Sequence, residues 1–87
     1  MAQYKLAECY RKGNGVEKDL AEAVKWFKKA ANQNDPLAQN DLGACYANGD
    51  GVEKDLKKAV RWYKKAAAQD EETAQYNLAV CYEKGQS

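Results

Sequence analysis

Three cysteines are the side chains of this sequence most suited to chemistry, as nucleophiles, metal ligands or disulfide partners. Cys9, Cys45 and Cys81 follow one another at intervals of 36 residues. An odd count at a long, constant spacing matches neither a disulfide framework nor a zinc site. The chain has no histidine that could act as a base for a cysteine nucleophile or as an imidazole ligand. We therefore predict that cysteine fills one buried position in each copy of a repeat.

Glycine pairs and aspartates are the other candidates for chemistry. Gly13-Asn14-Gly15 and Gly49-Asp50-Gly51 lack the later glycine and the Lys-Ser/Thr pair of a nucleotide-binding loop. Asp19 and Asp55 recur in the same register, so helix capping explains them better than paired-carboxylate catalysis. We predict that the chain is not an enzyme and that it has no catalytic, cofactor-binding or metal-binding residue.

The interval of 36 residues extends along the whole chain. The segment from Gly13 to Leu20 recurs at 49–56, and the segment from Ala23 to Ala31 recurs at 59–67. About 20 of the 36 positions match between the two complete copies, which is typical of a tandem repeat. We predict a single domain over 1–87, made of two complete copies and one partial copy: 2–37, 38–73 and 74–87.

Each copy contains two stretches of helical periodicity that are separated by a glycine pair. The first copy predicts two helices, over 2–12 and 20–32. We expect Asp19 to cap the second helix, Glu22 to complete a capping box, and Val16 to pack under the turn. In the second copy Lys58 stands in the place of this glutamate. The predicted fold class is all-α, an α/α superhelix of antiparallel helix pairs with five helices.

The charges of the sequence are almost balanced, with 14 basic and 13 acidic residues and a formal net charge of +1. Basic and acidic residues alternate along the chain, which favours neither nucleic acid nor a membrane surface as a partner. No stretch approaches the roughly 18 apolar residues of a membrane-spanning helix, and the N-terminus does not resemble a signal peptide. With cysteines that we expect to stay reduced, these features favour a cytoplasmic location.

The repeated residues resemble the Sel1-like repeat, a relative of the tetratricopeptide repeat. The run that carries the resemblance is Ala-Gln-x-x-Leu-Gly/Ala-x-Cys-Tyr-x-x-Gly-x-Gly-Val-x-Lys-Asp-Leu-x-x-Ala-Val-x-Trp-Tyr/Phe-x-Lys-Ala-Ala, and it covers essentially the whole chain. The resemblance implies a right-handed solenoid whose concave side is lined by the first helix of each pair. It also implies an adaptor that recruits other proteins, without naming the partner.

Two departures from the family pattern are visible. Asn34 and Asp70 replace the usual glycine after the second helix of each copy, and both residue types tolerate a left-handed backbone. In the cysteine-rich secreted branch, disulfides tie the end of one helix to the next, whereas this chain has alanine and glutamine near those positions: Ala31, Ala67, Gln39 and Gln75. The resemblance therefore favours the branch without disulfides.

Repeated aromatic and basic residues leave two interpretations open. Trp26 and Trp62, with tyrosines at one register in all three copies, fit core positions better than an aromatic binding platform: Tyr10, Tyr46 and Tyr82. Lys28-Lys29 and Lys64-Lys65 end the second helix of each copy, where cations favour the helix C-terminus. A solvated helix end is the preferred interpretation of these lysines, and a basic docking patch is the alternative.

Positions that differ between copies are free of the demands of the repeat, and in the first helices they share one face. The family resemblance independently places that face on the concave groove. The candidate protein-binding residues are Tyr4, Lys5, Glu8, Arg11, Lys12, Asn40, Asp41, Ala44, Ala47, Asn48, Tyr76, Asn77, Val80, Glu83 and Lys84. Solvent exposure alone also explains this variability. The tyrosines favour binding, whereas Ala44 and Ala47 are expected to offer a ligand little to grip.

Three hypotheses of function and origin follow. The first is a non-enzymatic scaffold or adaptor that binds a peptide or protein segment on the concave face. The second is a structural module that self-associates by end-to-end stacking or a swapped dimer, because the third copy stops at Gly85-Gln86-Ser87 without its second helix. The third is that the chain is an excised or engineered piece of a longer array.

Overall fold

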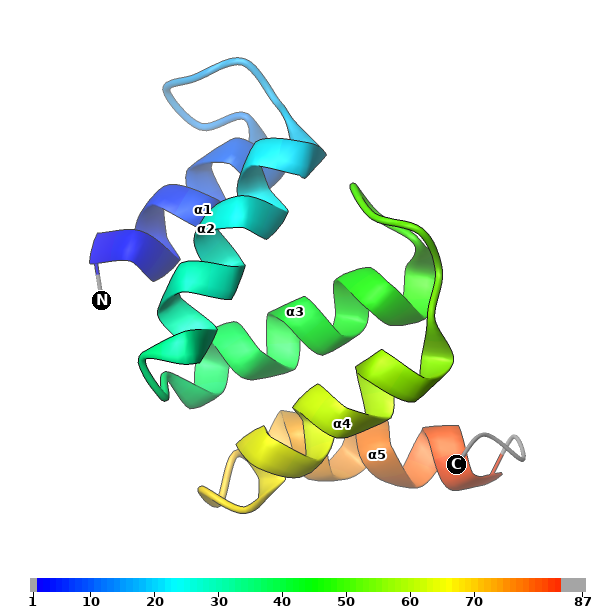
Figure 1. Cartoon of the computed structure of the whole chain (residues 1–87). Coiled ribbons are helices and arrows are strands. Elements are labelled where there is room, and N and C mark those ends of the chain that lie inside the picture. Colours follow the sequence, from blue (N-terminus) through cyan, green and yellow to red (C-terminus); the bar gives the residue numbers. More distant parts are fainter. Residues whose placement is uncertain (1, 84–87) are drawn as a thin grey trace.

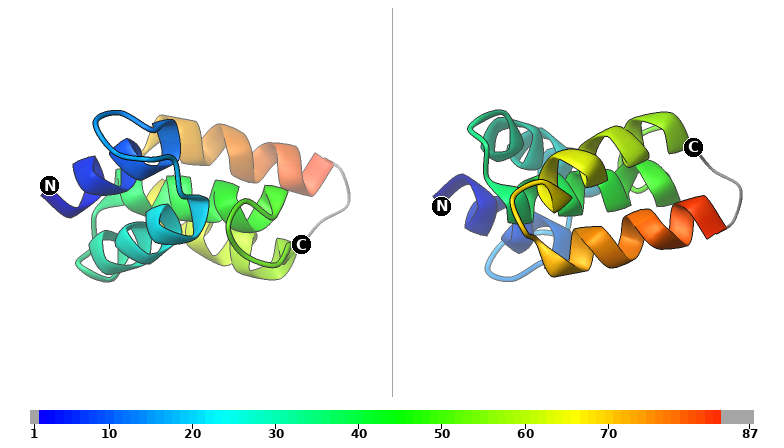
Figure 2. Two further views of the ribbon diagram at one scale, coloured as in Figure 1. Left: turned by 90° about the horizontal axis from the view of Figure 1, so that it is seen from above. Right: turned by 90° about the horizontal axis from the view of Figure 1, so that it is seen from below.

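The computed structural model describes residues 2–83, which form consecutive helices joined by short turns (Figure 1). The predicted all-α class and its five helices are confirmed, and no strand occurs between residues 2 and 83. Each helix packs against the next one along the chain. Helices α2 and α4 lie together on one side, with α1 and α5 on the other (Figure 2). The bounds are α1 Ala2–Lys12, α2 Leu20–Asn32, α3 Pro36–Asn48, α4 Leu56–Ala67 and α5 Glu72–Glu83.

Aspartate caps start α2 and α4, as predicted. Oδ1 of Asp19 accepts a hydrogen bond from the backbone N–H of Glu22 at 3.1 Å, and Asp55 accepts one from Lys58 at 3.2 Å. The predicted capping box is wrong in its second half, because the backbone N–H of Asp19 donates to the carbonyl of Tyr10 at 2.9 Å. Because the backbone N–H of Asp19 already has an acceptor, the repeat does not require a glutamate side chain three residues later to accept from it. This explains why lysine stands there in the second copy.

Left-handed residues end the helices and let the chain turn back. Asn34 and Asp70 have φ values of 73° and 65°, as the family pattern implied for the positions where glycine is usual. Nearby, the side-chain amide of Gln39 donates to the carbonyl of Ala31 at 3.2 Å, and Gln75 makes the same bond to Ala67 at 3.4 Å. A hydrogen bond therefore ties each pair of helices where the secreted branch is expected to carry a disulfide.

The core consists of small alanines around a few large side chains, which lets the helices approach closely. Phe27 and Leu42 are fully buried, and the Phe27 ring lies 5.9 Å from that of Tyr4 between centroids. Cys45 and Cys81 are buried in the core, as predicted, whereas Cys9 is only half-buried, so the prediction of a buried cysteine holds for two of the three copies. Burial raises the pKa of the Cys45 thiol to about 11, which suits a packing role, since the thiolate is the nucleophilic form.

The aromatic positions divide between core and surface. Trp26 and Trp62 are half-buried against the core, each with a lysine Nζ over its ring, at 4.5 Å for Lys29 and 4.9 Å for Lys65. Tyrosine at the repeated register changes along the array, from half-buried Tyr10 through buried Tyr46 to an exposed third copy. The core interpretation therefore holds for the first two copies but not for the last, where the ring of Tyr82 stays 46% exposed with Nζ of Lys64 over it, 5.9 Å from the centroid.

The turn of the second copy packs on the first copy, whereas the turn of the first copy does not pack in this way. Val52 is half-buried against the core, but the equivalent Val16 is 37% exposed, so the expectation that it packs under its turn is wrong. A Cβ on Gly51 would meet the carbonyl of Leu20 at the start of α2. Contact with the preceding copy, and not the turn itself, therefore buries this valine.

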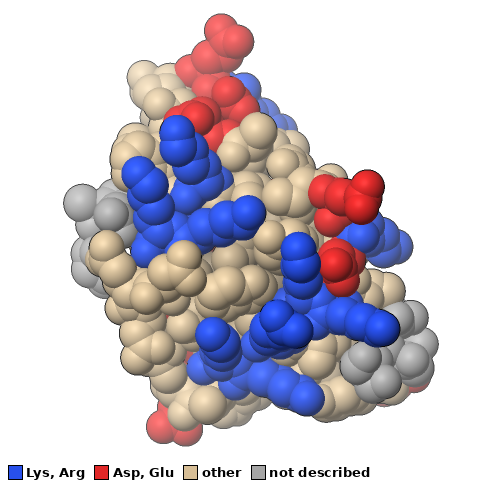
Figure 3. Space-filling view, viewed as in Figure 1, with Lys and Arg blue, Asp and Glu red and all other residues tan. Residues whose placement is uncertain are grey.

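The charged side chains separate by face, contrary to the alternation seen along the sequence. Lys and Arg gather over α2 and α4, and Asp and Glu lie towards the edges of the same face (Figure 3). Helix α4 carries five basic residues and no acidic residue. The near-zero net charge of the chain thus conceals a surface of α2 and α4 on which eight basic residues stand against one acidic residue.

Candidate functional site

The predicted concave-face residues lie on α1, α3 and α5, and we call them the A-helix face. They differ widely in burial. The exposed ones are Lys5, Arg11, Lys12, Asn48, Tyr76 and Glu83; the half-buried ones are Tyr4, Glu8, Asp41, Ala44, Ala47, Asn77 and Val80. Asn40 is only 7% exposed. Lys84 lies outside the described residues. The face is therefore a set of contacts between neighbouring helices with exposed side chains at its margins.

Between α1 and α3 this face holds a compact charged cluster. Nη2 of Arg11 donates to both carboxylate oxygens of Glu8, at 2.7 and 3.0 Å, and Nζ of Lys12 lies 3.4 Å from Oε1. Asp41 interacts with Glu8 and with the hydroxyl of Tyr4. Its Oδ2 is buried and has no hydrogen-bond partner among the described residues. The first repeat thus fills its part of the face with its own side chains.

Two neighbouring carboxyl groups in this cluster have pKa values that move in opposite directions. Burial, and then the hydrogen bond with Glu8, raise the pKa of Asp41 to about 6 from its usual 3.8. Burial also raises the pKa of Glu8, but the hydrogen bonds with Arg11, Asp41 and Lys12 and the charge of Arg11 together outweigh it, so the pKa of Glu8 falls below 4.5. At acidic pH the pair holds one proton on Asp41, and at neutral pH two negative charges lie close together.

We expect Asp41→Asn to stabilise the protein at neutral pH by about 1–2 kcal/mol, because the variant removes a poorly paired charge. An acid whose pKa is raised on folding contributes stability below its unfolded pKa, and this is lost as the pH rises through about 6. Glu8 acts in the opposite sense, and its stabilisation is lost as the pH falls below 4.5. Urea unfolding at about pH 4 and pH 7.5 measures this difference.

The stabilisation by Asp41→Asn should be large at the higher pH and small at the lower one. Asn77 occupies the equivalent position of the next repeat, so asparagine fits the fold there. A gain of the same size at both pH values would contradict the shared-proton account of Glu8 and Asp41.

Between α3 and α5 a different arrangement joins the helices. The side-chain amide of Asn77 donates to Oδ1 of Asn40 at 3.0 Å. Because Asn40 is buried in this contact, the prediction that it faces a ligand needs correction. Its amide group is occupied in holding two repeats together. Variation between copies marked this position, yet the variation reflects different pairings between neighbouring helices.

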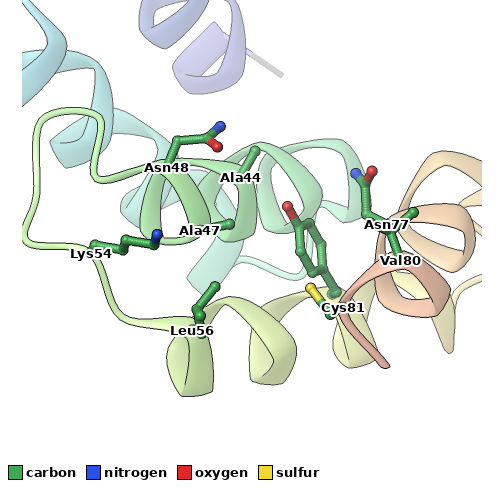
Figure 4. Close-up of a pocket in the computed structure, with 9 residues that line it drawn as sticks. Ala44, Ala47, Asn48, Lys54, Leu56, Asn77, Val80 and Cys81 are labelled. Carbon is green, nitrogen blue, oxygen red and sulfur yellow. The ribbon is translucent and has the colours of Figure 1, made fainter. Parts of the chain in front are cut away.

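A cavity of about 440 Å³ opens beside this contact, between α3, α4 and α5 (Figure 4). It is lined by Ala44, Ala47, Asn48, Lys54, Leu56, Tyr63, Asn77, Val80 and Cys81. The expectation that Ala44 and Ala47 offer little to grip is reversed in one respect, since their small side chains are what leaves the space open. In the first repeat the same two positions hold the larger side chains of Glu8 and Arg11, which form an ion pair.

Four lining residues were missed by comparison of the copies. Lys54, Leu56, Tyr63 and Cys81 match between copies or nearly so, and they were therefore assigned to the architecture of the repeat. Burial, and next the neighbouring Cys81, raise the pKa of Tyr63 to about 12, so its hydroxyl stays neutral and can both donate and accept. Residues that build a repeat can line a cavity wherever a neighbour is small.

The Sel1 repeat model matches this chain three times, at residues 1–35, 36–71 and 73–87. The chain belongs to the Sel1 repeat family. Sel1 repeat proteins are generally scaffolds for protein interaction and are generally not enzymes. The cavity and the charged cluster both lie between neighbouring Sel1 repeats of this chain. No curated protein sequence matches the chain.

Solved structures support the same Sel1 assignment. A Sel1 repeat protein from Oxalobacter formigenes is 39% identical, with a TM-score of 0.93 over 97% of this chain and 35% of that one. The protective antigen c5321 of uropathogenic Escherichia coli is 40% identical, with a TM-score of 0.95 over 97% and 18% of the two chains. Helicobacter pylori cysteine-rich protein B is 34% identical, with a TM-score of 0.83 over 87% and 57%. The chain thus spans from about a fifth to just over half of these structures.

Two further properties concern the Sel1 repeats within residues 2–83. None of their helices has the length and apolar character needed to cross a membrane. In the same range no three or more cysteine, aspartate or glutamate side chains come together in a way that could hold a metal ion. The A-helix face thus combines a cavity with polar groups in its lining and the exposed side chain of Tyr76.

Proposed function

We propose that this chain is a protein-binding scaffold whose A-helix face receives a peptide or protein segment, with the cavity between α3 and α5 as the principal contact. The observation that carries the proposal is the cavity itself, about 440 Å³, on the face that varies between copies. Its volume lies within the range of sites that hold a small ligand or a side chain. The membership of the Sel1 family supports the same class of function.

The lining of the cavity favours an apolar side chain with a polar backbone beside it. Ala47, Leu56 and Val80 supply apolar surface, whereas Asn48 and Lys54 supply polar groups. Such a mixture of apolar surface and few polar groups is typical of sites that fix the orientation of what they bind. A segment with one bulky apolar residue would bury that residue in the cavity and hydrogen-bond to the rim.

Tyr76 extends this surface along α5. It is 70% exposed, although a tyrosine would bury much apolar area if covered. Tyrosine is enriched among residues that dominate binding energy at interfaces. Its neighbour Asn77 lines the cavity, so one ligand segment can reach both.

The double variant Ala44→Glu/Ala47→Arg is expected to weaken ligand binding strongly, because it puts the larger Glu8–Arg11 pair of the first repeat at two positions where alanine lines the cavity. In the first repeat Glu8 and Arg11 form an ion pair at 2.7 Å, so the transplanted pair is compatible with the fold. Peptides selected by display on the intact chain supply the ligand. We expect Kd to rise at least about tenfold, which corresponds to a loss of about 1.4 kcal/mol in binding free energy.

The matched control is the reverse change, Glu8→Ala/Arg11→Ala, which removes the same pair from the first repeat. It should leave the affinity of a peptide held between α3 and α5 within about twofold, a difference of less than 0.5 kcal/mol. Equal affinity for wild type and the Ala44→Glu/Ala47→Arg variant would show that the cavity is not the binding site.

A second candidate function is self-association through the outer face of α5. Ala79 is exposed there, whereas the equivalent Gly43 and Ala7 are buried. Tyr82 is 46% exposed, against 7% for Tyr46. Exposed apolar side chains on an outer helix of a solenoid favour contact with a second copy. Light scattering over a concentration series tests this candidate, and a monomer at every concentration would rule it out.

A further inference from the structure

The surface formed by α2 and α4 carries a dense group of exposed cations, none of which belongs to the A-helix face. Eight basic residues lie on these two helices and are exposed, against the single acidic residue Glu22 (Figure 3). We call them the basic ridge: Lys25, Lys28, Lys29, Lys57, Lys58, Arg61, Lys64 and Lys65. Helices α2 and α4, which carry the ridge, lie on the side of the molecule opposite α1 and α5 (Figure 2), although Lys64 reaches the ring of Tyr82 on α5.

The cations of the ridge are almost entirely without acidic partners inside the described chain. Among the ridge cations, only Lys25 has a carboxylate oxygen within 4.0 Å inside residues 2–83. This is Oε1 of Glu22, which lies 3.9 Å from Nζ of Lys25. Four lysines rest over aromatic rings, at 4.5 to 5.9 Å from the centroids. Cation–π contacts hold these side chains in place but do not neutralise them.

Helix-end electrostatics explains only part of the ridge. Lysines in the last turn, such as Lys64 and Lys65, are favoured by the helix dipole. Lys57 and Lys58 lie in the first turn of α4, where a cation is unfavourable, and the equivalent residues of α2 are Ala21 and Glu22. In addition, Lys57 and Lys65 each lie four residues from Arg61, so like charges repel along one face. The helix dipole and the repulsion of like charges therefore both disfavour the cations at the start of α4, although Lys58 also lies over the ring of Tyr46.

We propose that the basic ridge binds an acidic segment of a partner protein. This goes beyond the proposed function, because it adds a second surface on other helices and does not depend on the cavity. Charge complementarity defines the partner: carboxylates would supply the counter-charges that the chain itself lacks along α4. The sequence left a basic docking patch open as the alternative for Lys28-Lys29 and Lys64-Lys65, and the further cations in the first turn of α4 favour that alternative.

The size and composition of the ridge favour an acidic peptide over nucleic acid. Helix α4 has 12 residues, a length of about 18 Å, which matches about six residues of extended chain. Seven of the eight cations of the ridge are lysine, whereas bidentate recognition of phosphate oxygens favours arginine. The acidic side chains at the edges of this face would repel a polyanion longer than the ridge (Figure 3).

The test measures binding of a fluorescent hexaglutamate peptide to the whole chain, with hexaglutamine as the uncharged probe. We expect binding of hexaglutamate that weakens steeply with salt, and no binding of hexaglutamine. The triple variant Lys57→Gln/Arg61→Gln/Lys64→Gln should lose at least about tenfold in affinity. The control Asn14→Asp/Lys18→Gln/Thr73→Glu lowers the net charge equally at exposed positions outside the ridge and the A-helix face, and should lose less than about twofold.

A second variant separates binding from stability. Lys57→Glu places an acid at the start of α4 and four residues before Arg61, so it should raise Tm while weakening hexaglutamate binding. Equal losses for the two triple variants would overturn the proposal, since only net charge would then matter. Tighter ridge-dependent binding of an anionic phosphatidylserine vesicle or a short DNA duplex would also overturn it and assign the ridge to that partner. Failure of the cavity variants leaves these outcomes unchanged.

Discussion

Gly51→Ala is expected to lower the free energy of unfolding by about 3 kcal/mol, far more than most alanine substitutions in a turn. The φ angle of 76° is already unfavourable for any residue with a Cβ. The added Cβ would also meet the carbonyl carbon and oxygen of Leu20 too closely for either backbone to remain in place. The turn would have to move away from α2, and Val52 would lose its packing.

Gly15→Ala is the matched control for this prediction. Gly15 has a φ of 77° but has no atom within 4 Å of the position of an added Cβ. Its replacement should cost only the backbone strain, about 1 kcal/mol. Urea unfolding of both variants, followed by circular dichroism, gives the difference. Equal costs at the two glycines would mean that contact between repeats through this turn contributes nothing to stability.

Phe27→Ala should have the largest effect on stability of any core change, about 3–5 kcal/mol. Phe27 is fully buried where α1, α2 and the charged cluster meet, and its ring contacts that of Tyr4. A chain of 87 residues has a total stability of roughly 4–13 kcal/mol, so this loss removes much or all of it. Thermal unfolding should show a large fall in Tm or no folded baseline.

Phe27→Leu and Lys28→Ala are the controls for the core. Leucine keeps most of the buried apolar volume and should cost about 1–1.5 kcal/mol. Lys28 is exposed, so its replacement should change stability by less than about 0.5 kcal/mol. A Phe27→Ala variant that is nearly as stable as the Lys28→Ala variant would contradict the assignment of the core.

The sequence predicted the helices well because the signals that define them are local and occur more than once. Asp19 and Asp55 cap helices at the same register, and Asn34 and Asp70 adopt the left-handed conformation that their residue types permit. Repetition made the prediction stronger, because a motif that recurs at a fixed period rarely arises by chance. Where the sequence failed, as at Val16, the deciding contact comes from a neighbouring repeat.

The candidate site was only partly predictable, for the same physical reason. Comparison of copies marks Ala44 and Ala47 as variable, but it does not show that their small size opens a cavity against α4 and α5. It marks Asn40 and Asp41 alike, although one is buried in a contact with Asn77 and the other belongs to a charged cluster. Pairings between helices depend on which side chains meet, and no single repeat contains that information.

The surface charge illustrates the same limit. The chain carries 14 basic and 13 acidic residues, and the sum suggests a neutral surface. Helical geometry places the cations of α2 and α4 on one side, and the turns and the other helices carry most of the acids. The positions of the charged residues in the folded chain, and not their numbers, distinguish a surface of mixed charge from one with a basic ridge.

The central claim is that a ligand segment binds the A-helix face at the cavity between α3 and α5. Its most direct test is backbone NMR of the labelled chain, titrated with a peptide selected on that chain. The account predicts that the amide signals of Ala44, Ala47 and Val80 shift and saturate together, while those of the basic ridge and of the outer face of α5 stay unchanged. Shifts confined to Ala79 and Tyr82 that depend on protein concentration would contradict it and show that the chain binds a second copy of itself.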